Sequence, residues 1–146
     1  MWILRSLILG GLFCVSACSM LSPKAEYIPE GDELKAAVVG VPYLLKINIL
    51  GGRVIDGWYE SEPDYKPGLV TPNDAGIFLR NCRLPESKTE SFLPKTPLYN
   101  GNCIEVYGTP TKAGELKIKI DGGMYGSMIA PASEFSKEYK INVTQP

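Results

Sequence analysis

The sequence predicts an all-β protein, a β-sandwich built from short strands. Three segments alternate apolar and polar residues with a period of two, as half-buried strands do: residues 43–50, 115–121 and 135–143. The chain also has 15 glycines and 12 prolines among its 146 residues, so turn signals interrupt it too often for long helices. Several short strands separated by frequent turns favour a sandwich or a barrel.

Two further elements are expected in the first half of the chain. Residues 34–39 form a short apolar stretch that suits a first edge strand. Gly51-Gly52 predicts a tight turn, and residues 53–59 then form the returning strand of a hairpin. On that strand Trp58 falls on the face opposite the apolar one, so we expect its side chain to be exposed.

The middle of the chain predicts two strands and a long excursion. Residues 77–79 are an apolar strand that leads to Cys82, and residues 104–107 alternate again. Between them, residues 84–102 are rich in proline, charged and hydroxyl side chains, which indicates a surface loop.

The N-terminus has the layout of a secretory signal peptide. Arg5 is followed by an apolar run over residues 7–15 and then by small residues. Val15-Ser16-Ala17-Cys18, at the end of that run, resembles the lipobox of bacterial lipoproteins, in which cleavage falls just before the cysteine and lipid is attached to its sulfur. The resemblance implies a signal peptide over residues 1–17 and a diacylglycerol and palmitate anchor on Cys18.

Two other interpretations of this N-terminus stay open. The apolar run is about half the roughly 20 residues that a transmembrane helix needs, which disfavours an uncleaved anchor. Ordinary secretion would leave Cys18 as a disulfide cysteine. In enteric-type bacteria an aspartate after the lipidated cysteine resembles an inner-membrane retention signal. This chain has Ser19 there, which favours the outer membrane, on its periplasmic or surface face.

The lipobox divides the chain into three parts. After the signal peptide, residues 18–33 are polar, contain prolines and lack periodicity, so we expect a lipidated tether. Residues 34–146 then form one β-sandwich domain, a usual domain size. Anchoring through lipid is effective because each buried methylene contributes roughly 0.8 kcal/mol.

The four cysteines reduce to one pair. Cys14 leaves with the signal peptide and Cys18 takes the lipid, so Cys82 and Cys103 remain. In an oxidising envelope compartment such a pair closes a structural disulfide. A catalytic or metal-binding thiol pair is disfavoured, because the chain has no histidine to act as base or ligand.

One turn carries a resemblance to a known family. Residues 108–114, Gly-Thr-Pro-Thr-Lys-Ala-Gly, precede an alternating strand and resemble the Gly-Thr-Pro-x-x-x-Gly turn of bacterial immunoglobulin-like (cadherin-like) domains. The resemblance covers residues 39–143 and implies an immunoglobulin-like β-sandwich with a role in adhesion or binding. The chain departs from the family pattern by a longer insertion between residues 69 and 108, which carries the cysteine pair and would form a disulfide-closed loop.

Composition excludes several classes of function. The formal net charge is −1, so no basic face for nucleic acid is expected. The absence of histidine removes the usual catalytic triads and most zinc sites. We therefore expect no metal, no cofactor and no enzyme activity, but a lipid-anchored module that binds an envelope protein or a glycan, or has a structural role.

Two alternative functions stay open. Asp56, Glu60, Glu62 and Asp64 form an acidic cluster beside aromatic residues, as in a small glycan-acting hydrolase, although a solvated loop is the plainer interpretation. The same carboxylates suit calcium, but no spaced loop motif supports it. The second alternative function is that of a component or exclusion factor of a secretion or conjugation apparatus.

A partner-binding surface is expected in the loops. The loop before the last strand is uncharged and apolar, and binding surfaces favour Tyr, Trp and Met. We therefore expect Trp58, Tyr125 and Met128 to form a protein-binding patch. The alternative is that this loop, with Met124 and Ile129, folds back into the end of the sandwich and completes its core.

Overall fold

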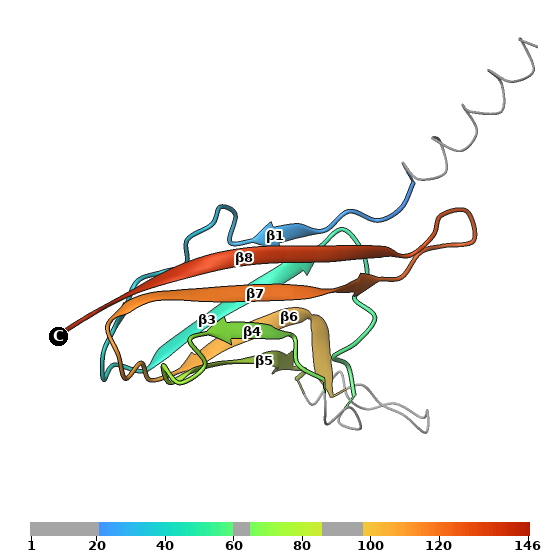
Figure 1. Ribbon diagram of the computed structural model, residues 1–146. Coiled ribbons are helices and arrows are strands. Elements are labelled where there is room, and N and C mark those ends of the chain that lie inside the picture. Colours follow the sequence, from blue (N-terminus) through green and yellow to red (C-terminus); the bar gives the residue numbers. More distant parts are fainter. Residues whose placement is uncertain (1–20, 60–64, 86–97) are drawn as a thin grey trace, which may run out of the picture.

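The computed structural model describes residues 21–59, 65–85 and 98–146. In these ranges eight strands form two four-stranded sheets that pack face to face (Figure 1). The first sheet has the order β1-β3-β6-β5 and the second β2-β8-β7-β4. The strands are β1 (Glu26–Ile28), β2 (Ala37–Val38), β3 (Tyr43–Leu50), β4 (Gly68–Thr71), β5 (Ile77–Arg83), β6 (Tyr99–Gly108), β7 (Gly114–Met124) and β8 (Ser133–Thr144).

This strand order is that of an immunoglobulin-like domain. Constant-type immunoglobulin sheets contain strands ABED and CFG. Here β1, β3, β6 and β5 take the places of A, B, E and D, while β4, β7 and β8 take those of C, F and G. The extra strand β2 pairs in parallel with the end of β8. The predicted fold class, an all-β immunoglobulin-like sandwich, is confirmed.

The three alternating segments form the strands that were predicted from them. They are β3, β7 and β8, and their inward-facing residues meet in one core between the sheets. The expected first edge strand is shorter than its apolar stretch, because only β2 pairs with β8. The largest fully buried side chains are Tyr139, Ile47, Ile49, Ile77, Ile104, Ile118, Ile120, Met124 and Ile141.

The expected hairpin after Gly51-Gly52 is wrong. β3 pairs with β1 and β6, and no strand returns along it from residues 53–59. Instead the chain crosses to the other sheet, where Val54 bridges Met124 at the end of β7. The apolar pattern of residues 53–59 is explained by this crossing, since Val54 is buried between the sheets.

The expected tether is shorter than residues 18–33, because part of it belongs to the sandwich. β1 pairs with β3 from Glu26 to Ile28, and the Tyr27 ring lies 6.4 Å from the Phe135 ring, centroid to centroid. Tyr139 donates its hydroxyl to the Pro29 carbonyl at 2.6 Å. A three-residue strand next to prolines is too short to show periodicity, so only its contacts reveal it.

The predicted disulfide between Cys82 and Cys103 is confirmed. It joins β5 to β6 within one sheet, with the two Cα atoms 5.3 Å apart and a sequence separation of 21. The pairing register shifts next to it, between Asn81 and Cys82. The bond closes the base of the excursion between these strands, of which residues 86–97 lie outside the described part of the chain.

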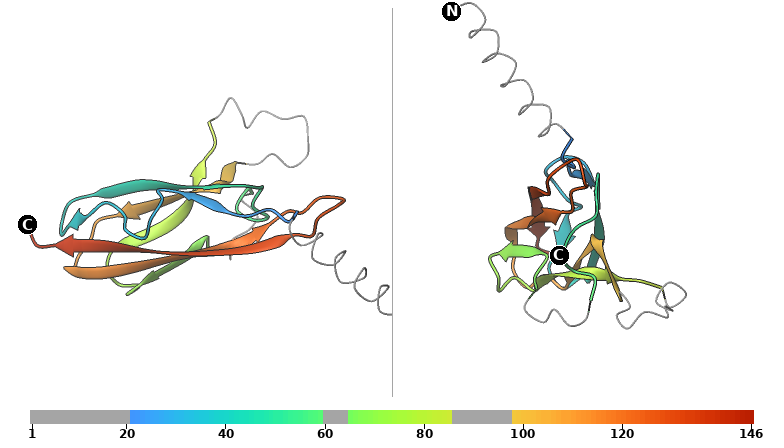
Figure 2. Two further views of the ribbon diagram at one scale, coloured as in Figure 1. Left: turned by 90° about the horizontal axis from the view of Figure 1, so that it is seen from above. Right: turned by 90° about the vertical axis from the view of Figure 1, so that its right-hand side faces the viewer.

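The two ends of the sandwich differ in construction. At the turn end, residues 39–42, 72–76 and 109–113 form short connections beside the C-terminus (Figure 1). The Gly40 N–H donates to the Pro110 carbonyl there at 2.9 Å. At the loop end, residues 21–25, 51–59 and 125–132 lie together (Figures 1 and 2). The chain therefore enters the sandwich at the loop end.

Two buried tyrosine hydroxyls link the N-terminal segment to the core. Tyr139 donates to Pro29, as described, and Tyr43 donates to the Lys35 carbonyl at 2.7 Å. Burial raises the pKa of each from the ordinary 10.0 to about 12, because a phenolate is poorly solvated there. Both tyrosines stay protonated in the folded protein at a pH where they ionise in the unfolded chain.

Alkaline pH is therefore expected to destabilise the protein. The folded pKa lies above the unfolded pKa, so the stabilisation is complete below about pH 10 and is lost as the pH rises towards about 12. Thermal melts over this range should show a falling Tm. A Tyr43→Phe variant should show a shallower fall, because it lacks one ionising group, and an unchanged slope would contradict this origin.

Candidate functional site at the loop end

The loop end is organised by the side chain of Asn102 on β6. Its Nδ2 donates to the Ile49 carbonyl at 2.8 Å and to the Gly52 carbonyl at 2.7 Å, and its Oδ1 accepts from the Val54 N–H at 3.0 Å. These bonds hold the chain where it leaves β3 and crosses to β7. Asn102 could not be predicted from the sequence, because a polar residue inside an apparent surface excursion carries no signal of this role.

Trp58 is not exposed as predicted but half-buried. Its Nε1 donates to the Val54 carbonyl at 2.8 Å, and the Arg53 guanidinium carbon lies 3.9 Å from the ring centroid. Its own carbonyl accepts from the N–H groups of Leu98 and Tyr99 at 3.0 and 3.2 Å. Trp58 therefore braces the crossing segment against the start of β6.

The β7–β8 loop presents large apolar side chains to solvent. Tyr125, Met128 and Ile129 have relative exposures of 53%, 104% and 73%, whereas Met124 at the end of β7 is fully buried. Of the large side chains in the alternative that the loop completes the core, only Met124 is buried. Tyr125 and Met128 are exposed, as a binding patch requires, whereas Trp58 is half-buried.

The entering chain is bound to the base of this loop. Ser133, the first residue of β8, donates its hydroxyl to the Pro23 carbonyl at 2.5 Å. On the other side, Gly51 has a φ of 100°, and a Cβ there would collide with the Lys24 carbonyl. The backbone of Pro23 and Lys24 therefore lies between the end of β3 and the start of β8.

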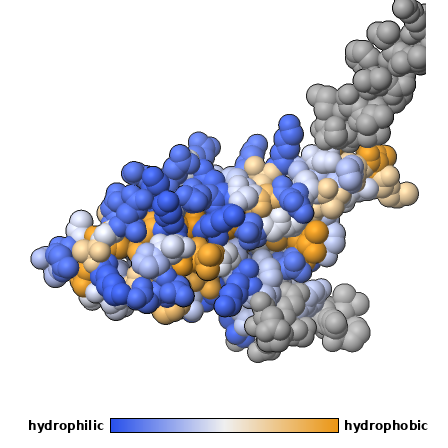
Figure 3. All heavy atoms as spheres, in the orientation of Figure 1, coloured by the Kyte–Doolittle hydropathy of each residue, from blue (hydrophilic) through white to orange (hydrophobic). Residues whose placement is uncertain are grey.

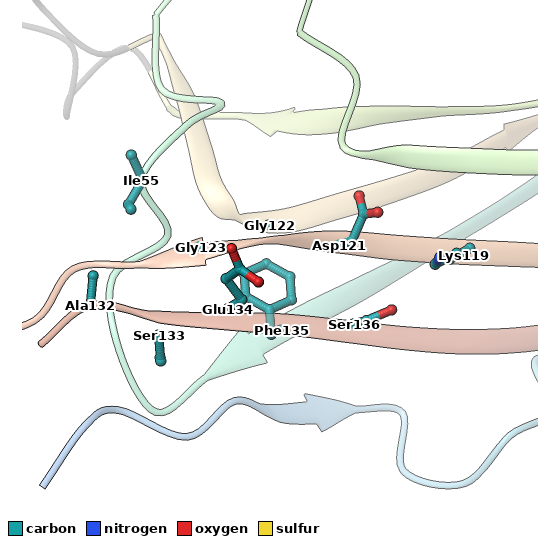
Figure 4. Close-up of a pocket in the computed structure, with 10 residues that line it drawn as sticks. All are labelled: Ile55, Lys119, Asp121, Gly122, Gly123, Ala132, Ser133, Glu134, Phe135 and Ser136. Carbon is teal, nitrogen blue, oxygen red and sulfur yellow. The ribbon is translucent and has the colours of Figure 1, made fainter. Parts of the chain in front are cut away.

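Several surface hollows adjoin the loop end, and two of them differ clearly in their lining residues. The larger, of about 730 Å³, runs along β7 and β8 and is lined by Lys119, Asp121 and Glu134 on one side and by Ile55 on the other (Figure 4). It exists because Gly122 and Gly123 have no side chains, and the Phe135 ring packs directly against Gly122. The lining charges are mixed, so the groove selects no single kind of ligand by charge.

The second hollow is lined by aromatic and cationic residues. It has about 300 Å³ and includes Tyr59, Tyr65 and Tyr99 with Lys66 and Arg80. Arg80 also contacts Glu105 at 2.7 Å, and this bond raises the pKa of its guanidinium. Tyr59 and Tyr65, which flank the predicted acidic cluster in sequence, thus line the same hollow.

The acidic cluster is only partly within the described residues. Asp56 is exposed in the crossing segment, whereas Glu60, Glu62 and Asp64 lie outside the described part of the chain. Among the described residues, no group of three or more Asp, Glu, Cys or His side chains is placed to hold a metal ion. Of the four carboxylates on which the hydrolase alternative rests, only Asp56 lies within the described residues.

The outer faces of the two sheets differ from each other. The face of β7 and β8 is charged, as the outward Lys117, Lys119 and Lys140 predicted. The face of the other sheet carries an apolar row, in which Leu44 and Phe78 flank Tyr107 across three strands. Leu44 and Phe78 are both more than half exposed. This row was not predicted from the sequence, because the pairing that builds it joins three separate strands.

Comparison with known proteins adds no relative. No protein-family model matches the chain, and no curated protein is significantly similar to it in sequence. The resemblance to bacterial immunoglobulin-like domains stays a prediction from the 108–114 turn. In the described ranges, no helix has the length and apolar character to cross a bilayer.

Proposed function

We propose that the chain is a lipid-anchored protein of the bacterial cell envelope that acts as a non-catalytic binding or structural module. The lipid on Cys18 attaches it to the membrane, with the outer membrane favoured by Ser19. Residues 1–20 lie outside the described part of the chain, so the anchor rests on the lipobox resemblance. Its partners are the membrane and an envelope protein or glycan.

The observation that carries the proposal is the place where the chain enters the sandwich. Pro23 is bound to Ser133 at the loop end, and Cys18 precedes it by five residues. Five extended residues span at most about 18 Å. A lipid on Cys18 therefore holds the loop end next to the bilayer and leaves the turn end pointing away from it.

The loop end also has the composition of a contact surface. In immunoglobulin variable domains the B–C and F–G loops at one end bind the antigen, and their counterparts here are the β3–β4 connection and the β7–β8 loop. Tyr125 and Met128 belong to residue types that are enriched at interfaces. Trp58 contributes indirectly, by bracing the crossing segment.

Replacing Cys18 with serine is expected to abolish lipid attachment. The lipid is linked through the cysteine sulfur, so the variant should stay uncleaved and take up no label from a fatty-acid probe fed to the producing bacteria. The unsubstituted chain should be labelled and recovered with the membrane fraction. A Cys14→Ser variant is the matched control and should be labelled normally, because Cys14 belongs to the signal peptide.

Persistent labelling of the Cys18→Ser variant would show that another residue carries the lipid. An unlabelled but secreted native chain would favour ordinary secretion instead. Either result would contradict the proposed anchor.

A further inference from the structure

We propose that the tip of the β7–β8 loop inserts into the surface of the bilayer to which the lipid on Cys18 attaches the chain. Met128 and Ile129 form the inserted tip, and Tyr125 lies at its edge. The inference rests on the proposed lipid anchor and names the bilayer as the partner of the loop end.

The loop has a built shape with its apolar residues at the apex. The Ser127 N–H donates to the Ala130 carbonyl at 2.8 Å, and the Ala130 N–H donates back to the Ser127 carbonyl at 3.4 Å. Met128 and Ile129 are the two residues between them. The Ile129 N–H also donates to the Ser127 hydroxyl at 3.3 Å.

These bonds matter for entry into an apolar layer. Backbone groups that lack a partner there are costly, because no water replaces the lost hydrogen bonds. The turn satisfies several of its own groups, and the following Pro131 has no N–H to satisfy. These bonds reduce the number of backbone groups at the tip that would lose a partner on leaving water.

The loop lies where the anchor brings the membrane. Residues 21–25 and the β7–β8 loop are at the same end of the sandwich in two perpendicular views, and the loop extends beyond the sheets (Figures 1 and 2). Apolar atoms gather at this end beside the start of the described chain (Figure 3). Leu21, at that start, is itself 59% exposed. One membrane thus covers both segments.

Charge at the loop end neither drives nor prevents this contact. Residues 125–132 carry no charged side chain. Around them the exposed cations Lys24 and Arg53 are balanced by the exposed acids Asp56 and Glu134. Apolar burial at the tip is therefore the main attraction, and the contact should depend little on salt.

The docked loop and the lipid together give the domain two points of attachment. A single tether would let the sandwich turn freely, whereas a second contact beside it restricts the rotation. The turn end, and the apolar row around Tyr107, then face the aqueous compartment, where a soluble partner can reach them.

The test places a tryptophan at the tip of the loop in the mature, lipidated protein. The Met128→Trp variant is reconstituted into phosphatidylcholine vesicles whose acyl chains are brominated, since bromine quenches indole fluorescence at short range. Phe78→Trp is the matched control, because Phe78 is also an exposed apolar residue but lies on a sheet face towards the turn end. The emission of Trp58, measured in the unsubstituted protein, is subtracted from the emission of each variant.

We expect the tryptophan at position 128 to emit at a shorter wavelength than the tryptophan of the Phe78→Trp control. We also expect brominated lipid to quench it at least about threefold more, since interfacial side chains reach the acyl boundary. Flotation of the vesicles on a density gradient shows whether the protein is attached to them. If both variants float with the vesicles and are quenched equally, the docking is overturned but the anchor stands. A blue shift without quenching would show self-association and would also overturn it. Protein that does not float with the vesicles would contradict the anchor, and the docking with it.

Discussion

Replacing Asn102 with alanine is expected to lower the free energy of unfolding by about 3 kcal/mol, because it removes three side-chain hydrogen bonds worth roughly 1 kcal/mol each. The three partners, Ile49, Gly52 and Val54, are backbone groups at the point where the chain crosses between the sheets. Urea denaturation measures the effect. Asn142→Ala on the exposed face of β8 is the matched control and should change stability by less than about 0.5 kcal/mol.

The same Asn102 variant should change the environment of Trp58. The indole donates to the carbonyl of Val54, whose N–H is bound by Asn102. Loosening of that segment should therefore shift the Trp58 emission to longer wavelength. A loss of stability similar to that of the Asn142 control, with unchanged emission, would show that the crossing is held by other contacts.

Removing the disulfide is expected to have an effect of similar size. The bond between Cys82 and Cys103 closes a loop of about 20 residues, which corresponds to roughly 3 kcal/mol of chain entropy in the unfolded state. For a domain of this size, that change lowers Tm by about 10 °C. Melting curves with and without reductant measure this change in Tm. A Cys82→Ser/Cys103→Ser variant should have the Tm of the chemically reduced protein in both conditions.

A thiol titration provides the independent control for this prediction. The native, unreduced protein should show no reactive thiol at either position until it is unfolded and reduced. Two titratable thiols in the native protein, or a Tm that does not respond to reductant, would contradict a stabilising bond in solution.

The strands that could be predicted from the sequence are those with long alternation. β3, β7 and β8 each bury every second residue over several positions, so their pattern survives without knowledge of their partners. The disulfide was predictable for a different reason, because the predicted signal peptide and lipidation site left only Cys82 and Cys103 to pair. Both inferences depend on local or countable features of the chain.

The errors arose where distant residues decide the local structure. The Gly51-Gly52 turn indicated a hairpin, but Asn102, about fifty residues later, bonds to Gly52 and Val54 and directs the chain to the other sheet. Trp58 looked exposed by alternation, yet its indole finds an acceptor in the same crossing segment. The exposure of Tyr125 and Met128 was foreseen from composition, while the turn that presents Met128 came only from the structure.

Mass spectrometry of the mature protein from bacterial membranes tests the central claim most directly. If the chain is a lipoprotein, its N-terminal peptide begins at Cys18 and carries the mass of a diacylglycerol with any added acyl chain, while Met1 to Ala17 are absent. An N-terminus at another residue, or an unmodified Cys18 in the mature chain, would contradict both the lipid anchor and the placement of the loop end at the membrane.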